Sequence, residues 1–417
     1  MALLLALWQF FIFAPAHSAA PVAALHLMTY QGWGYNVDPG PQGDRVKKIL
    51  GDAVRLGFRE VVFNFRGHMV TGTGAEIRSS VPLGQQASEG ALLLETVRYA
   101  RSLGLRVAFR PILLVIGPKG EFPYSLKGRT WWHGNIQPKD PARWFEAYFA
   151  YHKRYLEIAR AAGVEWYSIG AEMNSMTSGR GNKKGEQVRG YPGEWVKLIE
   201  RAREILGPAT KISYGVNYTD QVTSEGGRRI EGGELEQWRY FLTEEFRRPS
   251  EQKFQREMQS LWQALDIVGI DYYRALASER RSYPDKLASL SALLTERAKS
   301  HANQLDNALT EIGLSVGYDK PVHFQEMGYR SVERSFLRPA AYENRKGVFN
   351  ELHQAAAWDA FLNAFWGPGW PWFAGTALWQ VLVDEDPKIA GDTGFSPLGK
   401  PLTESVLQKH FSLSPPK

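Results

Sequence analysis

The sequence predicts an α/β protein, a single-domain (β/α)8 TIM barrel with long insertions in its βα loops. Short runs of β-branched and aromatic residues alternate almost strictly with longer segments whose apolar residues have helical spacing, and eight such runs occur along the chain. A chain of 417 residues is long enough for a barrel, and it contains no recognisable linker or repeat. No Gly-x-Gly-x-x-Gly or phosphate loop opens a predicted helix, which disfavours a doubly wound sheet.

The eight predicted strands differ in length but share a buried, β-forming composition. They are expected at residues 23–30, 60–66, 105–115, 164–174, 211–217, 265–273, 320–326 and 374–380. Apolar residues with helical spacing predict helices at residues 44–56, 89–103, 141–162, 191–206, 284–315 and 350–366. The charged segment 218–263 has helical character in two places, and we expect it to be an insertion that packs beside the site.

The composition indicates a soluble globular protein, because 44% of the residues are hydrophobic and 23% are charged. Fourteen Trp and eighteen Tyr are typical of sugar-binding clefts, although a large core is the alternative explanation. The formal charge of +6 favours encounters with anionic polymers. Nucleic acid is not an expected partner, since the basic residues are scattered and no nucleic-acid-binding motif occurs.

Residues 1–20 have the pattern of a signal peptide or membrane anchor, which leaves residues 21–417 as the barrel domain. The segment Ala2–Ala14 is almost wholly apolar and precedes a small-residue stretch that a signal peptidase can cut, although no basic residue precedes it. We therefore expect a secreted or periplasmic protein, bound to the membrane only if this segment is uncleaved. Neither disulfides nor a metal or other cofactor is expected, because the chain lacks cysteine and its histidines lack metal-ligand spacing.

Two of the predicted strands deliver a glutamate where the strand should end, Glu172 and Glu326. All strands of a barrel end on the same face, so these two carboxyl groups should converge across one mouth. Such a pair suits glycoside hydrolysis, in which one carboxylic acid protonates the departing oxygen and the other group attacks the anomeric carbon or activates water. A single glutamate at a strand end is more often a helix cap or an ion-pair partner. The pair is the specific signal.

Three segments resemble the signatures of strands four, six and seven in glycoside hydrolase family 113. They are Tyr167-Ser-Ile-Gly-Ala-Glu-Met-Asn174, Asp266-Ile-Val-Gly-Ile-Asp-Tyr-Tyr273 and Lys320-Pro-Val-His-Phe-Gln-Glu-Met-Gly-Tyr-Arg-Ser331. The family belongs to a large clan of retaining barrel enzymes, and its known members are mainly β-mannanases. The resemblance, which runs from about residue 25 to residue 380, implies that Glu172 is the acid/base and Glu326 the nucleophile.

The sequence departs from the wider clan at Ala171. Many clan members have an asparagine immediately before the acid/base, where it binds the sugar 2-hydroxyl, whereas family 113 itself lacks it. Another residue must then hold the sugar, and Asn174 and Asn217 are the candidates.

Other strand ends and loops supply candidate substrate-binding residues. Either Tyr272 or Tyr273 is expected to hydrogen-bond Glu326, and a positive charge from Arg66 or Arg110 should favour its ionised form. Asp271 alternates with Ile270, so we expect it to point away from the site and to pair with one of these arginines. Trp379 is expected to form the apolar floor under the sugar. The other candidate contacts are Trp33, Trp131 and Trp132, with His68 and His133, whereas Trp166, Trp262 and Trp358 are assigned to the core.

These observations predict a monomeric, retaining endo-glycosidase that acts on a polysaccharide or oligosaccharide by double displacement, with β-mannan as the first candidate substrate. Two alternatives remain at this point. One is a hydrolase of a bacterial exopolysaccharide or cell-wall glycan, which the export signal and basic surface would suit. The other is a catalytically inactive barrel that only binds glycan.

Overall fold

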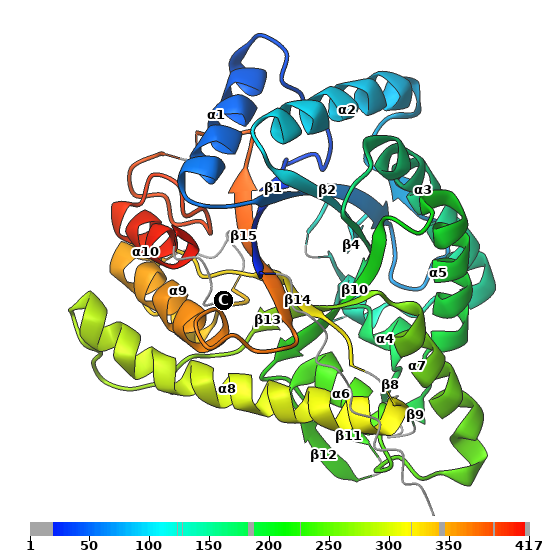
Figure 1. Ribbon diagram of the computed structural model, residues 1–417. Helices are drawn as coiled ribbons and strands as arrows, with labels where there is room; N and C mark the ends of the chain where they lie inside the picture. Colours follow the sequence, from blue (N-terminus) through cyan, green and yellow to red (C-terminus); the bar gives the residue numbers. More distant parts are fainter. Residues whose placement is uncertain are drawn as a thin grey trace, which may run out of the picture.

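The computed structural model describes residues 20–122, 124–126, 128–181, 187–225, 227–317, 319–341, 347–386 and 388–412. Eight parallel strands form a closed barrel with helices around its outside (Figure 1). The strands follow the order β1-β15-β14-β13-β10-β7-β4-β2, and β2 pairs with β1 to close the ring. The predicted fold is therefore confirmed. The barrel strands are β1 (Val22–Met28), β2 (Glu60–Met69), β4 (Arg106–Val115), β7 (Trp166–Ala171), β10 (Lys211–Thr219), β13 (Ile267–Tyr273), β14 (Val322–Met327) and β15 (Phe373–Leu382).

Helices separate the strands at the places where the apolar spacing predicts them. In α3 (Pro141–Ala162), the Asp140 side chain accepts a hydrogen bond from Arg143 N at 3.0 Å, and Gly163 ends the helix in the left-handed conformation. The remaining helices are α1 (Pro41–Arg55), α2 (Gln86–Ser102), α4 (Asn174–Thr177), α5 (Pro192–Leu206), α6 (Gly233–Leu242), α7 (Gln252–Ala264), α8 (Leu287–Val316), α9 (Glu351–Phe365) and α10 (Pro401–Ser412).

Short elements occupy the loops. Hairpins form from β5 (Tyr124–Leu126) with β6 (Arg129–Trp131), from β8 (Arg180–Gly181) with β9 (Gln187–Val188), and from β11 (Val222–Glu225) with β12 (Arg228–Glu231). The strand β3 (Arg78–Ser79) pairs with the end of β2. Single 3-10 turns are η1 (Leu83–Gln85), η2 (His133–Asn135), η3 (Pro249–Glu251) and η4 (Ser335–Leu337). The predicted insertion thus contains β11, β12, α6 and α7.

The core forms between the outer faces of the strands and the inner faces of the helices. Trp166, Trp262 and Trp358 are buried, as predicted. Apart from Ala20, residues 1–20, predicted to be a signal peptide or anchor, lie outside the described residues. Within the described ranges, none of the helices has the length and apolar character needed to cross a membrane.

The parallel register is irregular just before both glutamates. Three residue steps of β7, from Ser168 to Ala171, pair with two residue steps of β10. Two residue steps of β14, from Phe324 to Glu326, pair with one residue step of β13, from Ile270 to Asp271. Because bulges change which way a side chain points, they re-aim the strand ends at the barrel mouth.

Candidate active site

Glu172 lies immediately after β7 in a conformation that non-glycine residues rarely adopt. Its φ is 52°, in the left-handed region, and its backbone N donates a hydrogen bond to Gly215 O at 2.7 Å. Holding a glutamate in this conformation costs free energy, and such residues concentrate at functional sites.

Glu326 is held by two groups, one from the neighbouring strand β13 and one from β4 across the barrel. Tyr273 Oη donates a hydrogen bond to Glu326 Oε1 at 2.8 Å, and Arg110 Nη1 lies 2.8 Å from Glu326 Oε2. The predicted alternatives are therefore resolved, because Tyr273 and Arg110 contact the glutamate. Tyr272 instead points outward from the barrel, where its hydroxyl lies 2.8 Å from His301 Nδ1.

The expectation that Asp271 points away from the site is wrong, although the expected ion pair is present. Arg110 Nη2 lies 2.8 Å from Asp271 Oδ2, and the same guanidinium contacts Glu326 through its other nitrogen. Asp271 is fully buried in the barrel interior. Positions 271 and 273 of β13 therefore face inward together, and Asp271 orients the arginine that contacts Glu326.

The two glutamates lie close enough to influence one another electrostatically. Burial and, next, the negative charge of Glu326 together raise the pKa of Glu172 to about 8, although the positive charge of Arg110 partly offsets them. His133 Nε2 lies 3.4 Å from Glu172 Oε2, and burial lowers the pKa of His133 to about 4. At pH 7, a protonated Glu172 thus stands beside a neutral imidazole and opposite Glu326. One carboxyl group can give a proton while the other acts as a nucleophile or base.

A buried hydrogen-bond cluster supports the backbone that follows Glu172. Tyr214 Oη accepts a hydrogen bond from Met173 N at 2.7 Å and donates one to Glu234 Oε1 at 3.0 Å. Thr177 Oγ1 donates to the same oxygen. Burial raises the pKa of Glu234 to about 8. Nothing in the sequence singles out Glu234, because it is one of several acidic residues in the charged insertion.

The two candidate asparagines contact each other. Asn217 Nδ2 donates a hydrogen bond to Asn174 Oδ1 at 3.0 Å, and Asn217 Oδ1 accepts one from Glu234 N at 2.9 Å. Both ends of the Asn217 side chain are therefore used inside the protein, and this residue is 2% exposed. Asn174 lines a cavity of about 860 Å³, called the larger cavity below, so it is better placed than Asn217 to meet a sugar hydroxyl.

The tryptophan candidates lie in different environments. Trp379 is half-buried beside the site, with the guanidinium carbon of Arg110 5.8 Å from its ring centre. Trp132 lines the larger cavity. Trp131 is only 8% exposed and belongs to the core, covered by Arg129 at 3.7 Å, so it offers a sugar little surface. Trp33 is half-buried in the loop after β1, where its backbone N donates to Thr29 Oγ1.

Arg66 and His68 lie at the end of β2 and contact neither glutamate. Arg66 Nη1 donates a hydrogen bond to Tyr30 O at 2.5 Å, and the arginine side chain packs over Gly32. His68 pairs in register with Arg78 of β3. The predicted alternative of Arg66 as the partner of Asp271 or Glu326 is therefore wrong, because Arg110 fills that position from the barrel interior.

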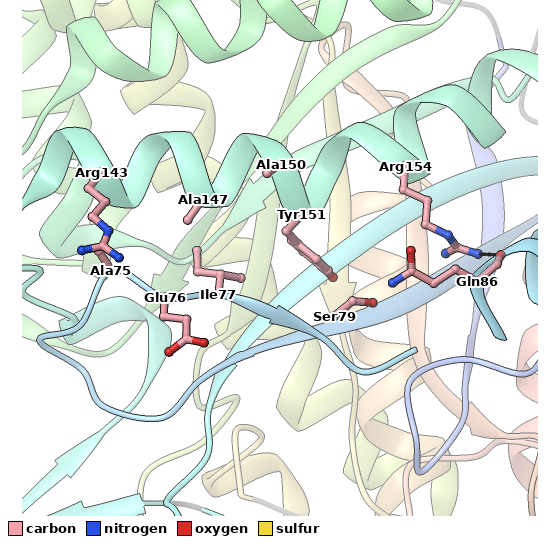
Figure 2. Close-up of a pocket in the computed structure, with 10 residues that line it drawn as sticks. All are labelled: Ala75, Glu76, Ile77, Ser79, Gln86, Arg143, Ala147, Ala150, Tyr151 and Arg154. Carbon is pink, nitrogen blue, oxygen red and sulfur yellow. Dashed lines mark hydrogen bonds between the residues drawn. The ribbon is translucent and has the colours of Figure 1, made fainter. Parts of the chain in front are cut away.

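The larger of the two cavities described here, about 860 Å³, reaches Asn174, two residues after Glu172, and neither glutamate lines it. Trp132 and Gly134, which flank His133, and Asn174 form the wall nearest Glu172. The opposite wall comes from the insertion, which confirms that this segment lies beside the site. Figure 2 shows the smaller cavity, about 370 Å³, between α3 and the segment around β3. None of the predicted site residues lines that smaller cavity.

A family model described as Glycoside Hydrolase Family 113 matches residues 46–218 and 248–400, which is most of the chain. The chain belongs to glycoside hydrolase family 113. A second model, the GTA TIM-barrel-like domain, matches residues 145–309. The family 113 model does not match residues 219–247 of this chain. These residues contain β11, β12 and α6, which contribute most of the far wall of the larger cavity. A comparison with curated protein sequences found no match.

Solved structures of family 113 enzymes share this fold. The GH113 beta-mannanase AaManA from Alicyclobacillus acidocaldarius, in complex with ManMIm, is 19% identical with a TM-score of 0.63. The match covers 94% of this chain and 98% of the mannanase. A GH113 beta-1,4-mannanase in a complex structure is 20% identical with a TM-score of 0.59, and the match covers 95% and 100% of the two chains. At these identities the likeness shows the fold alone.

Proposed function

We propose that this family 113 protein is a retaining endo-glycosidase that hydrolyses a polysaccharide by double displacement, with β-mannan as the first candidate substrate. One observation carries the proposal: Glu326, held by Tyr273 and Arg110, stands opposite a Glu172 whose pKa is raised to about 8. The first group has the environment of a nucleophile and the second that of a proton donor. The structures of family members described as β-mannanases support the choice of substrate.

In the first step, a Glu326 oxygen attacks the anomeric carbon while Glu172 gives its proton to the glycosidic oxygen. The bond between that oxygen and the anomeric carbon breaks, the leaving sugar departs with the proton, and a glycosyl ester of Glu326 remains. Tyr273 and Arg110 orient the attacking carboxylate. The half-buried ring of Trp379 supplies an apolar floor for the sugar.

In the second step, Glu172 acts as a base. Ester formation removes the negative charge of Glu326, so the pKa of Glu172 falls and its carboxylate can accept a proton from water. The resulting hydroxide oxygen bonds to the anomeric carbon, and the Glu326 ester is displaced. Two inversions at one carbon give net retention.

The test uses conservative variants of both glutamates on β-1,4-mannan and on a panel of other polysaccharides, with reducing ends as the readout. Glu172→Gln is expected to lower turnover by about 100- to 10,000-fold, and Glu326→Gln by at least about 1,000-fold. Glu95→Gln, an exposed change on α2, is the matched control. Full turnover by Glu326→Gln, or a first product of inverted configuration in proton NMR, would contradict the proposal. Binding without turnover by the wild type, on every polysaccharide of the panel, would favour the inactive glycan-binding barrel.

A further inference from the structure

The larger cavity carries an unusual concentration of charge for a site that meets neutral sugars. Its charged lining residues within the described ranges are Arg180, Arg189, Arg248, Glu225 and Glu251. Three positive side chains therefore face two negative ones. The pairing between them shows which charge is left over.

Arg189 and Arg248 are fully committed to the two glutamates. Arg189 Nη2 lies 2.9 Å from Glu225 Oε1, and its Nε contacts Glu251. Arg248 Nη1 lies 2.9 Å from Glu225 Oε1 and 3.1 Å from Glu251 Oε1. These four residues neutralise one another. Their ion pairs connect the segment that follows β9 with the end of β11 and with η3, and so stabilise the wall of the cavity.

Arg180 is the remaining cation. It is half-buried in β8, lines the cavity, and has no carboxylate partner within the described part of the chain. Burial lowers the pKa of Arg180, and the positive charge of Arg129 lowers it further, while Tyr191 acts in the opposite direction.

Arg129 has no carboxylate partner within the described ranges either. It stacks 3.7 Å from the Trp131 ring centre and donates a hydrogen bond to Asn135 O at 2.8 Å. Two like charges that lie near one another, with no carboxylate paired to either in the described part of the chain, cost free energy that a bound anion would recover.

We propose that the cavity is a subsite for a negatively charged sugar, with Arg180 binding the carboxylate and Arg129 reinforcing its charge. The guanidinium fork suits a planar carboxylate, and the ring of Trp132 gives the same cavity an apolar surface for the sugar itself. The preferred substrate would be a polysaccharide that contains acidic sugars. This inference rests on the proposed glycosidase function, which it narrows to a substrate class.

The subsite adjoins the proposed proton donor. Asn174, two residues after Glu172, lines the same cavity, as do Trp132 and Gly134 on either side of His133. An acidic sugar bound there would lie next to the bond that is cleaved. Most of the far wall, from Gln221 to Phe241, comes from residues that the family 113 model leaves unmatched, whereas Arg248 and Glu251 lie within the matched range.

The test measures binding in a Glu172→Gln background, in which turnover is expected to be strongly slowed and the side chain at position 172 is uncharged, like a protonated Glu172. The probes are β-1,4-mannotetraose and the tetramers in which a single sugar carries a carboxylate at C6, so each pair differs by one charged group. Calorimetry at low salt gives the affinities. Arg180→Gln removes the proposed contact, and Arg180→Lys keeps the charge but not the fork. Arg98→Gln makes the same charge change on the exposed face of α2 as a control.

At least one acidic tetramer should bind about tenfold more tightly than the neutral one, as expected for a hydrogen-bonded charge pair. Arg180→Gln should abolish this preference, Arg180→Lys should keep part of it, and Arg98→Gln should leave it unchanged. Equal binding of all tetramers, no binding of any acidic tetramer, or a preference that survives Arg180→Gln would overturn the subsite.

The outcome separates this inference from the proposed function. Hydrolysis of neutral mannan by the wild type without any preference for acidic tetramers would leave the glycosidase function intact and refute the subsite. An Arg180-dependent preference in a wild-type protein that hydrolyses neither kind of chain would support the subsite and refute the glycosidase.

Discussion

Replacing Glu326 with glutamine should lower the pKa of Glu172. The wild-type pKa of Glu172 is raised to about 8 by burial, and then by the negative charge of Glu326. The substitution removes that charge and keeps the size of the side chain. It also leaves Arg110 with one carboxylate partner fewer, so the positive charge acts more strongly on Glu172. Both changes favour the ionised form of Glu172.

The size of the shift follows from Coulomb's law. The carboxyl groups of a retaining pair lie about 5.5 Å apart, and at an effective dielectric constant of about 20 two unit charges at that separation repel by about 3 kcal/mol. Each pKa unit corresponds to about 1.4 kcal/mol, so the upper limit is a shift of about two units. Burial, the largest cause, is unchanged. The pKa of Glu172 should therefore fall to about 6 or 7 and not to the value of a free glutamate.

The pKa can be measured by carbon-13 NMR on protein labelled at the glutamate carboxyl carbons. The resonance that disappears in Glu172→Gln assigns the titration. Glu95→Gln removes an exposed carboxylate from α2 and should leave the curve unchanged. If Glu172 titrates at the same pH in Glu326→Gln as in the wild type, or at a higher one, the two groups do not share a site in the way the structure indicates.

Three further outcomes are expected. Wild-type kcat/KM should fall as the pH rises through about 8, because Glu172 then loses the proton it donates; a rate that holds to well above this pH would argue against that assignment. Tyr273→Phe removes a hydrogen bond to Glu326 and should lower kcat/KM by about 10- to 100-fold with an unchanged melting temperature; an equal loss of folding stability would mean a structural role. Glu234 has a folded-state pKa of about 8, so its stabilising contribution is complete below its unfolded pKa of about 4.3 and is lost as the pH rises to about 8. Glu234→Gln should therefore raise the melting temperature relative to wild type at pH about 8.5 and not at pH about 4, and a constant difference would refute the reasoning.

The barrel was predictable because its signals are local. Each barrel strand is a short run of β-forming residues, and all eight lie within a few residues of their predicted positions. The same locality placed Glu172 and Glu326 at strand ends, where the closed ring brings them together. The helix over residues 141–162 begins after the capping residue Asp140, with Pro141 in its first turn, and ends at Gly163. Its boundaries therefore match the prediction.

Choices between neighbouring residues were less predictable because they depend on register. Alternation along β13 puts positions 271 and 273 on one face and Tyr272 on the other, but one sequence does not say which face is inside. The register shift beside Glu326 then changes which residues of β13 and β14 face the same side of the sheet. Alternation does not separate Arg66 from Arg110 either, because Arg110 is in register with Asn64, two residues before Arg66 on the neighbouring strand. Arg66 therefore lies one layer further along β2, where it bonds to Tyr30 O and does not contact the glutamates.

Arg180 of the larger cavity and the buried Glu234 were the hardest residues to foresee. Arg180 lies in a polar segment with no periodic pattern, and Glu234 lies in a charged insertion where one carboxylate resembles the next. Their significance depends on tertiary pairing. Glu234 is buried against Tyr214 and Thr177, whereas Arg180 has no carboxylate partner among the described residues, where Glu225 and Glu251 pair with Arg189 and Arg248.

The charges at the barrel mouth bear on where an acidic sugar can bind. Arg110 is shared by Glu326 and Asp271, and burial raises the pKa of Asp271. The three groups carry no net charge when Asp271 is protonated and one negative charge when it is not, so in neither state is positive charge left for a substrate. A carboxylate on the sugar above Glu326 would be uncompensated or repelled, whereas one in the neighbouring cavity meets Arg180. The acidic tetramer that binds most tightly should therefore carry its charge beside the cleaved sugar and not on it.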